Sequence, residues 1–142
     1  MTVKIAPALA GFSGEWSLSR RIIDHRAGST GQFDGTAVFT LADYGLSYFE
    51  TGKLTLPGHA PFTAERRYRW CEVDGLVSVE FEDGRFFHSF DATTPEAQHW
   101  CDPDTYQVRY MFDEWPVWTS TWRVSGPRKD YEMVSSYQRP TG

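Results

Sequence analysis

The 142-residue chain is predicted to be an all-β protein, a single antiparallel up-and-down β-barrel of about nine strands with little helix. Three observations predict this class. Apolar and polar residues alternate along most of the chain. Gly, Asp or Pro interrupts the alternation roughly every ten residues, the spacing of antiparallel strands joined by short turns. Aromatic residues make up 16% of the chain, and such side chains favour strands and cores.

The composition narrows the class further. The length fits one domain, residues 1–142, with a core of its own. The net charge of −5 offers no basic surface for nucleic acid, and no apolar run is long enough to span a membrane. The opening MTVKIAPALAG has too short an apolar part for a secretory signal. Two cysteines, Cys71 and Cys101, fit reduced thiols, so we expect a cytoplasmic protein.

The expected strands follow one another as a meander, and a meander of this length closes into a barrel. A two-sheet sandwich is the alternative. Residues 1–11 are expected to form a short plug, 53–61 a loop, and 94–103 a longer irregular connection with room for one helical turn. The strands are expected at 12–25, 31–42, 45–52, 62–73, 76–82, 85–91, 105–112, 116–125 and 130–139.

Two Asp-Gly pairs set the register of the central strands. Asp-Gly favours a two-residue hairpin turn, so Val73 pairs with Leu76 and Glu82 with Arg85. Counting outward places charged residues opposite one another on one face, with Arg69 facing Glu80. The other face is apolar and aromatic and is therefore predicted to point inward. Its rows are Tyr68, Phe81 and Phe86, then Trp70, Val79 and His88, then Val77 and Phe90.

Alternation gives the inner face of other strands. Residues 33–41 alternate cleanly, which places Phe33 and Leu41 inside, and the pattern continues across a four-residue turn to an inward Glu50. A further inner stripe runs through Tyr106, Val108, Tyr110 and Phe112. In residues 115–124 the alternation does not show which face points inward, although Trp118 and Trp122 share one face and Arg123 lies on the other.

The stretch FSGEWSLSR, residues 12–20, resembles the Gly-x-Trp signature of the calycin superfamily, which includes lipocalins and fatty-acid-binding proteins. The resemblance implies a barrel with Trp16 at its closed end, beside Gly14 where strands crowd. It also implies that Arg139, in the Tyr-x-Arg that ends the last strand, covers the Trp16 ring. The whole chain is similar to uncharacterised bacterial lipocalin-like proteins, a likeness that implies the fold and no assigned activity.

The inner face predicts a cavity for one small molecule. A few polar groups among aromatic side chains are typical of a ligand site. We expect His88 and Arg66 to contact the polar part of the ligand, with Glu50 as an inward carboxylate. The alternative is a satisfied core, in which His88 bonds a tyrosine or a backbone carbonyl and Arg66 pairs with Glu50 or Asp83. The candidate ligand-binding residues are His88, Arg66, Tyr68, Trp70, Glu50, Phe81, Phe86, Tyr106 and Tyr110.

Other functions fit the sequence less well. An enzyme on the same barrel would use His88 and Glu50 as an acid–base pair, and a barrel with a filled interior would serve structure or partner binding. HWCDPDTY, residues 99–106, lacks the four spaced ligands of a zinc site, so no metal is expected. Haem, with His88 as axial ligand, is disfavoured, and no other cofactor is expected. The six tryptophans favour either a cavity lining or a homodimer face.

Overall fold

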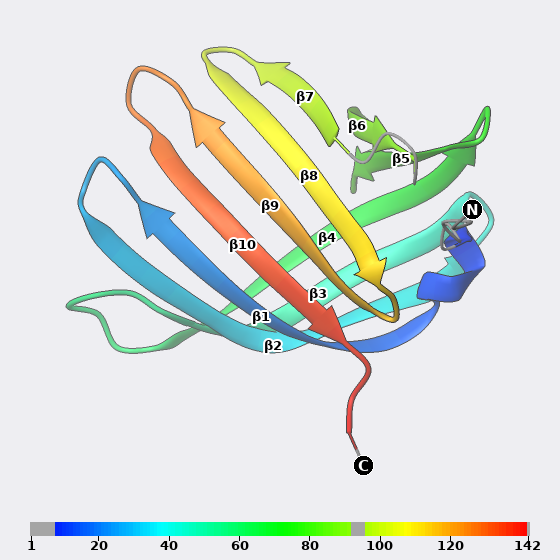
Figure 1. Ribbon diagram of the computed structural model, residues 1–142, viewed down its shortest axis with the longest axis horizontal. Coiled ribbons are helices and arrows are strands. Elements are labelled where there is room, and N and C mark those ends of the chain that lie inside the picture. Colours follow the sequence, from blue (N-terminus) through cyan, green and yellow to red (C-terminus); the bar gives the residue numbers. More distant parts are fainter. Residues whose placement is uncertain (1–7, 92–95, 142) are drawn as a thin grey trace.

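The computed structural model describes residues 8–91 and 96–141, and it shows an all-β fold of ten antiparallel strands preceded by one short 3₁₀ helix, η1 (Figure 1). The expected all-β barrel is confirmed. The elements are η1 (Leu9–Phe12), β1 (Gly14–Asp24), β2 (Ser29–Ala42), β3 (Gly45–Thr55), β4 (Phe62–Val73), β5 (Leu76–Phe81), β6 (Phe86–Phe90), β7 (Glu96–Cys101), β8 (Asp104–Glu114), β9 (Val117–Ser125) and β10 (Asp130–Gln138).

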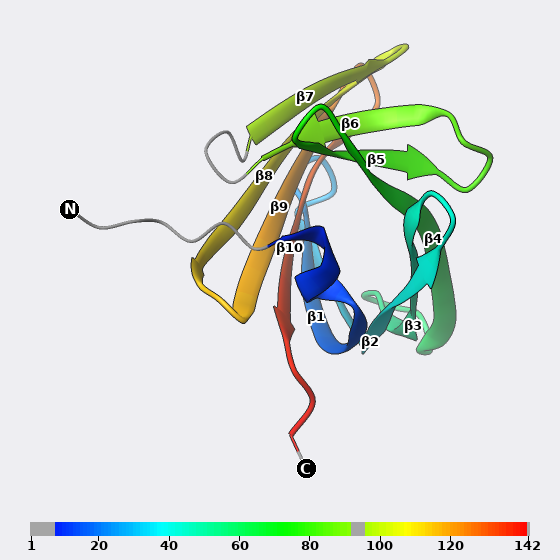
Figure 2. The same ribbon diagram turned by 90° about the vertical axis from the view of Figure 1, so that its right-hand side faces the viewer.

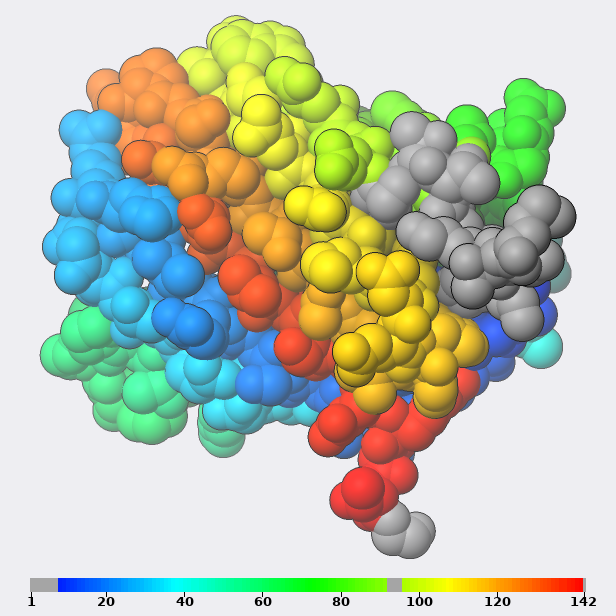
Figure 3. Space-filling view, viewed as in Figure 1, coloured from blue at the N-terminus to red at the C-terminus, as the bar shows by residue number. Residues whose placement is uncertain are grey.

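The strands form one curved sheet in the order β6-β5-β4-β3-β2-β1-β10-β9-β8-β7. Each hairpin pairs with the next, and β1 also pairs with β10, which joins the two ends of the chain into one wall. Figure 3 shows that wall, with blue β1 beside red β10. Among the described residues no ladder joins β6 to β7, so the barrel is nearly closed and has a seam at that point.

The plug fills one end of the barrel, as Figure 2 shows. Phe12, at the end of η1, is buried and lies against a ring of aromatic side chains that includes Trp16, Trp115 and Trp118. Gly14 has a φ of +105°, a conformation that glycine adopts without strain, and it turns the chain from the plug into β1. Of the plug predicted at 1–11, residues 1–7 lie outside the described part of the chain.

Trp16 lies fully buried beneath this plug, and Arg139 covers it. The guanidinium of Arg139 lies 3.8 Å from the centre of the Trp16 ring. Its nitrogen atoms donate hydrogen bonds of 3.0 Å to the backbone carbonyls of Gly11, Ser13 and Glu15. Trp16 itself donates from Nε1 to the carbonyl of Phe12 at 2.8 Å. The contact between Arg139 and Trp16 that the resemblance implied is therefore present.

The register predicted from the first Asp-Gly turn is confirmed, and that from the second is partly wrong. Val79 pairs with Trp70 on one side and with His88 on the other, as expected. A β-bulge then shifts the register, so Glu80 pairs with Phe86. The cause is a three-residue turn in place of two, because the Phe81 amide donates to the carbonyl of Arg85.

The bulge exchanges the faces of two neighbouring phenylalanines. Phe87 takes the buried inner position, while Phe86, predicted to face inward, is 56% exposed. The prediction for Leu41 is also wrong: this residue lies next to the β2–β3 turn and is 75% exposed, although its cross-strand partner Leu46 is buried. Glu50, Tyr110 and Trp118 are buried.

β7 is the strand that was not predicted from the sequence, because residues 94–103 were expected to form an irregular connection. The sequence Asp102-Pro103 indicated a loop, but those two residues form only the turn between β7 and β8. The flanking residues continue as a regular hairpin in which Cys101 pairs with Asp104. Residues 94 and 95 lie outside the described part of the chain. β3 also extends to Thr55, beyond the predicted end at 52.

Candidate functional site

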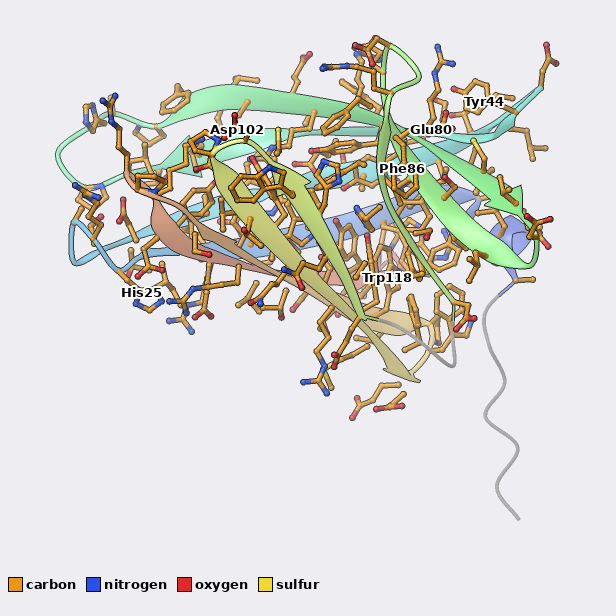
Figure 4. The ribbon with its side chains drawn as sticks, turned by 90° about the horizontal axis from the view of Figure 1, so that it is seen from above. His25, Tyr44, Glu80, Phe86, Asp102 and Trp118 are labelled. Carbon is orange, nitrogen blue, oxygen red and sulfur yellow. The ribbon has the colours of Figure 1, made fainter. Side chains whose placement is uncertain are left out.

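The interior of the barrel is packed from the plug to the level of His88. Aromatic rings fill it, with Trp118 stacked on Tyr137 at 3.8 Å and Phe90 on Tyr110 at 4.0 Å. Trp118 lies in the middle of the barrel in Figure 4. The remaining inner cavity measures about 20 Å³. That volume suits about one water molecule, so the deep interior has no space for an organic ligand.

A buried ion pair crosses this packed interior. Arg20 on β1 donates to both carboxylate oxygens of Glu50 on β3, at 2.6 and 2.9 Å. Nε of Arg20 donates to Ser135 on β10 at 2.7 Å. The carboxylate also accepts a 2.6 Å bond from the hydroxyl of Tyr48, which lies 2.9 Å from that of Tyr137. The network joins β1, β3 and β10, which lie within four consecutive strands of the sheet.

Mutual contact keeps this pair charged. Burial alone would raise the pKa of Glu50, but the hydrogen bond and charge of Arg20 outweigh it and hold the pKa below its usual value. Burial would likewise lower the pKa of Arg20, whereas Glu50 and the adjacent tyrosines raise it above its ordinary value. The alternative in which Glu50 pairs with Arg66 is not formed as a salt bridge, although the two residues are cross-strand neighbours and the charge of Arg66 also helps to lower the pKa of Glu50.

His88 is a neutral core histidine. It is 1% exposed, and its Nε2 lies 2.8 Å from the hydroxyl of Tyr110 on β8. Burial, with a smaller contribution from His99, lowers the pKa of His88 to about 3. Within the described part of the chain its Nδ1 has no hydrogen-bond partner. The partners of His88 and Glu50 are thus Tyr110 and Arg20, so the expected acid–base pair between them is not formed.

A second cavity opens at the mouth of the barrel, at the end opposite the plug. β5 and β6 are short, so no strand of the described chain pairs with residues 62–67 of β4 on that side. The resulting pocket has a volume of about 220 Å³ and is bounded by six strands and the start of β10. In Figure 4, His25 and Asp102 mark the loops at this end. Its lining comprises Arg66, Tyr68, Phe81, Phe87, Cys101, Tyr106, Trp122, Tyr131 and Met133.

Arg66 is the charged residue of this lining. Its side chain reaches across the barrel from β4, and its Nη2 lies 3.7 Å from the sulfur of Met133 on β10. The guanidinium carbon is 5.9 Å from the centre of the Trp122 ring on β9. Among the described residues, no carboxylate lies within ion-pairing distance of Arg66. Asp104, at the rim, is bonded to Lys129 at 2.9 Å.

The structure places the predicted site residues at the two cavities, with the exception of Phe86. Arg66, Tyr68, Phe81 and Tyr106 line the mouth pocket. Trp70, Tyr110 and Glu50 line the small inner cavity, His88 packs beside Tyr110, and Phe86 faces solvent.

Sequence reasoning missed Arg20 and several pocket residues. The signal for Arg20 was present, because Trp16, Leu18 and Arg20 alternate on one face and Trp16 was expected inside. Alternation alone does not show whether Trp122 faces inward, and the inner position of Phe87 depends on the bulge. The remaining missed lining residues are Cys101, Tyr131 and Met133.

Within residues 8–91 and 96–141, no group of three or more His, Cys, Asp or Glu side chains is placed to hold a metal ion. Cys71 and Cys101 are both unbridged. None of the described helices has the length and apolar character needed to cross a membrane.

These features define a class: a nearly closed antiparallel β-barrel with a packed aromatic interior and a pocket at its mouth. Residues 12–139 match the "Family of unknown function (DUF6314)", and the chain belongs to that family. A comparison with curated proteins finds no match.

Proposed function

We propose that this protein is a calycin-type binding protein that takes one small aromatic molecule with a polar head into the mouth pocket. The observation that carries the proposal is the pocket itself: a cavity of about 220 Å³ with a largely aromatic wall and one arginine facing it. Small-molecule sites are concave and mostly apolar, with a few polar groups that orient the ligand. The two unbridged cysteines fit a reducing cytoplasm.

The dimensions of these two cavities limit where a ligand can sit inside the barrel. The inner cavity holds about 20 Å³, less than any organic molecule requires. The mouth pocket is smaller than the roughly 300–1,000 Å³ of drug-sized sites. We therefore assign it a molecule of one or two rings. Phe87 and Trp122, from opposite sides of the seam, supply ring surfaces against which such a molecule would pack.

Cys101 provides a direct test, because it is exposed and lines the pocket. Cys71 is buried, and burial raises the pKa of its thiol, so N-ethylmaleimide should modify Cys101 first. The neutral compound 2-naphthamide is titrated into the protein by isothermal calorimetry, before and after modification. We expect one binding site per chain, with an affinity at least about tenfold weaker after modification.

The Cys101→Ser variant, treated with the same reagent, is the matched control and should bind as the untreated protein does. Binding that survives modification of Cys101 would place the ligand elsewhere, and no saturable binding of 2-naphthamide would contradict the proposal. Native mass spectrometry of freshly purified protein would then identify a natural ligand by its mass.

A further inference from the structure

We propose that the natural ligand of the mouth pocket is an anion, a small aromatic carboxylate or a compound of similar charge, whose negative group pairs with Arg66. This inference rests on the proposed function and adds the charge of the ligand to it. It follows from the balance of charges inside the barrel, from the partners of Arg66, and from the arrangement of the pocket wall.

The side chains that line the two cavities carry an excess of positive charge. Three charged residues are among them: Arg20 and Glu50 at the inner cavity, and Arg66 at the mouth. His88, beside them, is uncharged at neutral pH because burial lowers its pKa to about 3. Asp104 at the rim is already paired with Lys129. Two guanidinium groups and one carboxylate leave a net charge of +1.

The geometry shows which of the two arginines remains without a counter-ion. Glu50 is the direct cross-strand neighbour of Arg66, yet both of its oxygens accept hydrogen bonds from Arg20. One of them also accepts from Tyr48. Both Glu50 oxygens are therefore bonded within the packed interior, and Arg66 shares only the longer-range attraction of that carboxylate. The direct contacts of Arg66 are with uncharged groups: the Met133 thioether, the Trp122 face and the Tyr68 hydroxyl. A half-buried guanidinium with such neutral neighbours favours an incoming anion.

The pocket wall fits an anion attached to a flat ring. Arg66 lies beside Trp122 and Met133, while Phe87, Tyr106 and Tyr131 form the rest of the aromatic surface. An anionic group on the guanidinium would place the attached ring among these side chains. A guanidinium binds a planar carboxylate through two parallel hydrogen bonds, which would also orient the ring.

The test compares two compounds of nearly equal shape, 2-naphthoate and neutral 2-naphthamide, titrated by calorimetry into the full chain at one ionic strength. We expect 2-naphthoate to bind at least about tenfold more tightly. Arg66→Gln should remove this preference while leaving the affinity for 2-naphthamide within about threefold. Arg66→Met, which keeps the length of the side chain without its charge, serves as a second variant in case one fails to fold.

Arg67→Gln is the matched control, since Arg67 is the next residue of β4, faces outward and stacks on Phe49. It removes one positive charge from the same strand and should keep the preference. Equal binding of the two compounds to the unmodified protein would overturn the inference and leave the proposed function standing. Equal loss of preference in Arg66→Gln and Arg67→Gln would also overturn it, because the effect would then come from net charge. Binding of neither compound would overturn both proposals.

Discussion

The two ends of the barrel each place an arginine beside a tryptophan, and the surroundings of the two pairs differ. At the closed end Arg139 lies 3.8 Å from the Trp16 ring, and three backbone carbonyls accept its hydrogen bonds. At the mouth Arg66 lies 5.9 Å from the Trp122 ring, and its polar contacts are the sulfur of Met133 and the hydroxyl of Tyr68. The same residue types therefore complete the fold at one end and remain available to a ligand at the other.

Substitutions at the closed end should reduce the stability of the protein more than substitutions at the mouth. Trp16 is fully buried among Phe12, Trp115 and Trp118, so Trp16→Ala removes a large side chain from a packed site. We expect a loss of about 4 kcal/mol in the free energy of unfolding, measured by urea denaturation. The fraction that remains folded should still bind 2-naphthamide. Trp100→Ala is the control, because Trp100 is 62% exposed and its loss should change stability by less than about 0.5 kcal/mol.

The packed interior should also respond to pH through His88. Its pKa is lowered to about 3, so between that value and the ordinary 6.5 the unfolded chain binds the proton more readily than the folded one. This contribution to stability is complete above pH 6.5 and falls as the pH drops. From pH 7 to pH 5 the wild type should lose about 2 kcal/mol more than His88→Gln. Denaturation curves at both pH values measure the difference, and equal losses in the two proteins would show that His88 titrates normally.

The smallest expected changes in stability come from substituting the two arginines, one at each end of the barrel. Arg139→Met should reduce the free energy of unfolding by about 1–2 kcal/mol, because the ring contact and the carbonyl partners are lost. Arg66→Met should change it by less than about 0.5 kcal/mol, since Arg66 has no ion pair among the described residues. Thermal and urea unfolding of both variants measure this. A larger cost for Arg66→Met than for Arg139→Met would reverse the assignment of the two ends.

The sequence predicted the fold better than the site, for physical reasons that particular residues show. Alternation and the first Asp-Gly turn were enough to pair Trp70 with Val79, because ladder register follows from turn length. His88 joins the same row because the bulge compensates for the longer second turn. The same rule failed at Phe86, where a turn one residue longer exchanged the faces of Phe86 and Phe87, and the bulge restored the predicted register from His88 onward. Asp-Gly is compatible with both turn lengths, so the composition of the turn alone did not distinguish them.

The site was harder to predict because it depends on contacts across the barrel. His88 and Glu50 were rightly placed inside, but their partners, Tyr110 and Arg20, lie on other strands. Alternation shows which face a residue occupies and says nothing of which residue it meets on the far wall. The position of the pocket depended on β5 and β6 being short, and their lengths became evident only once their pairing with β4 was known.

The seam between β6 and β7 has a consequence for how the chain folds. Every ladder joins strands that are consecutive in sequence, except the one that pairs β1 with β10, where Ser17 meets Gln138. Closing that ladder requires the two ends of the chain to meet, and such distant contacts slow folding. A circular permutant that begins at β7 and ends at β6 would have its strands in the same order along the chain as in the sheet. In that arrangement each strand could add to a neighbour already in place, and the distant ladder would become one more local hairpin.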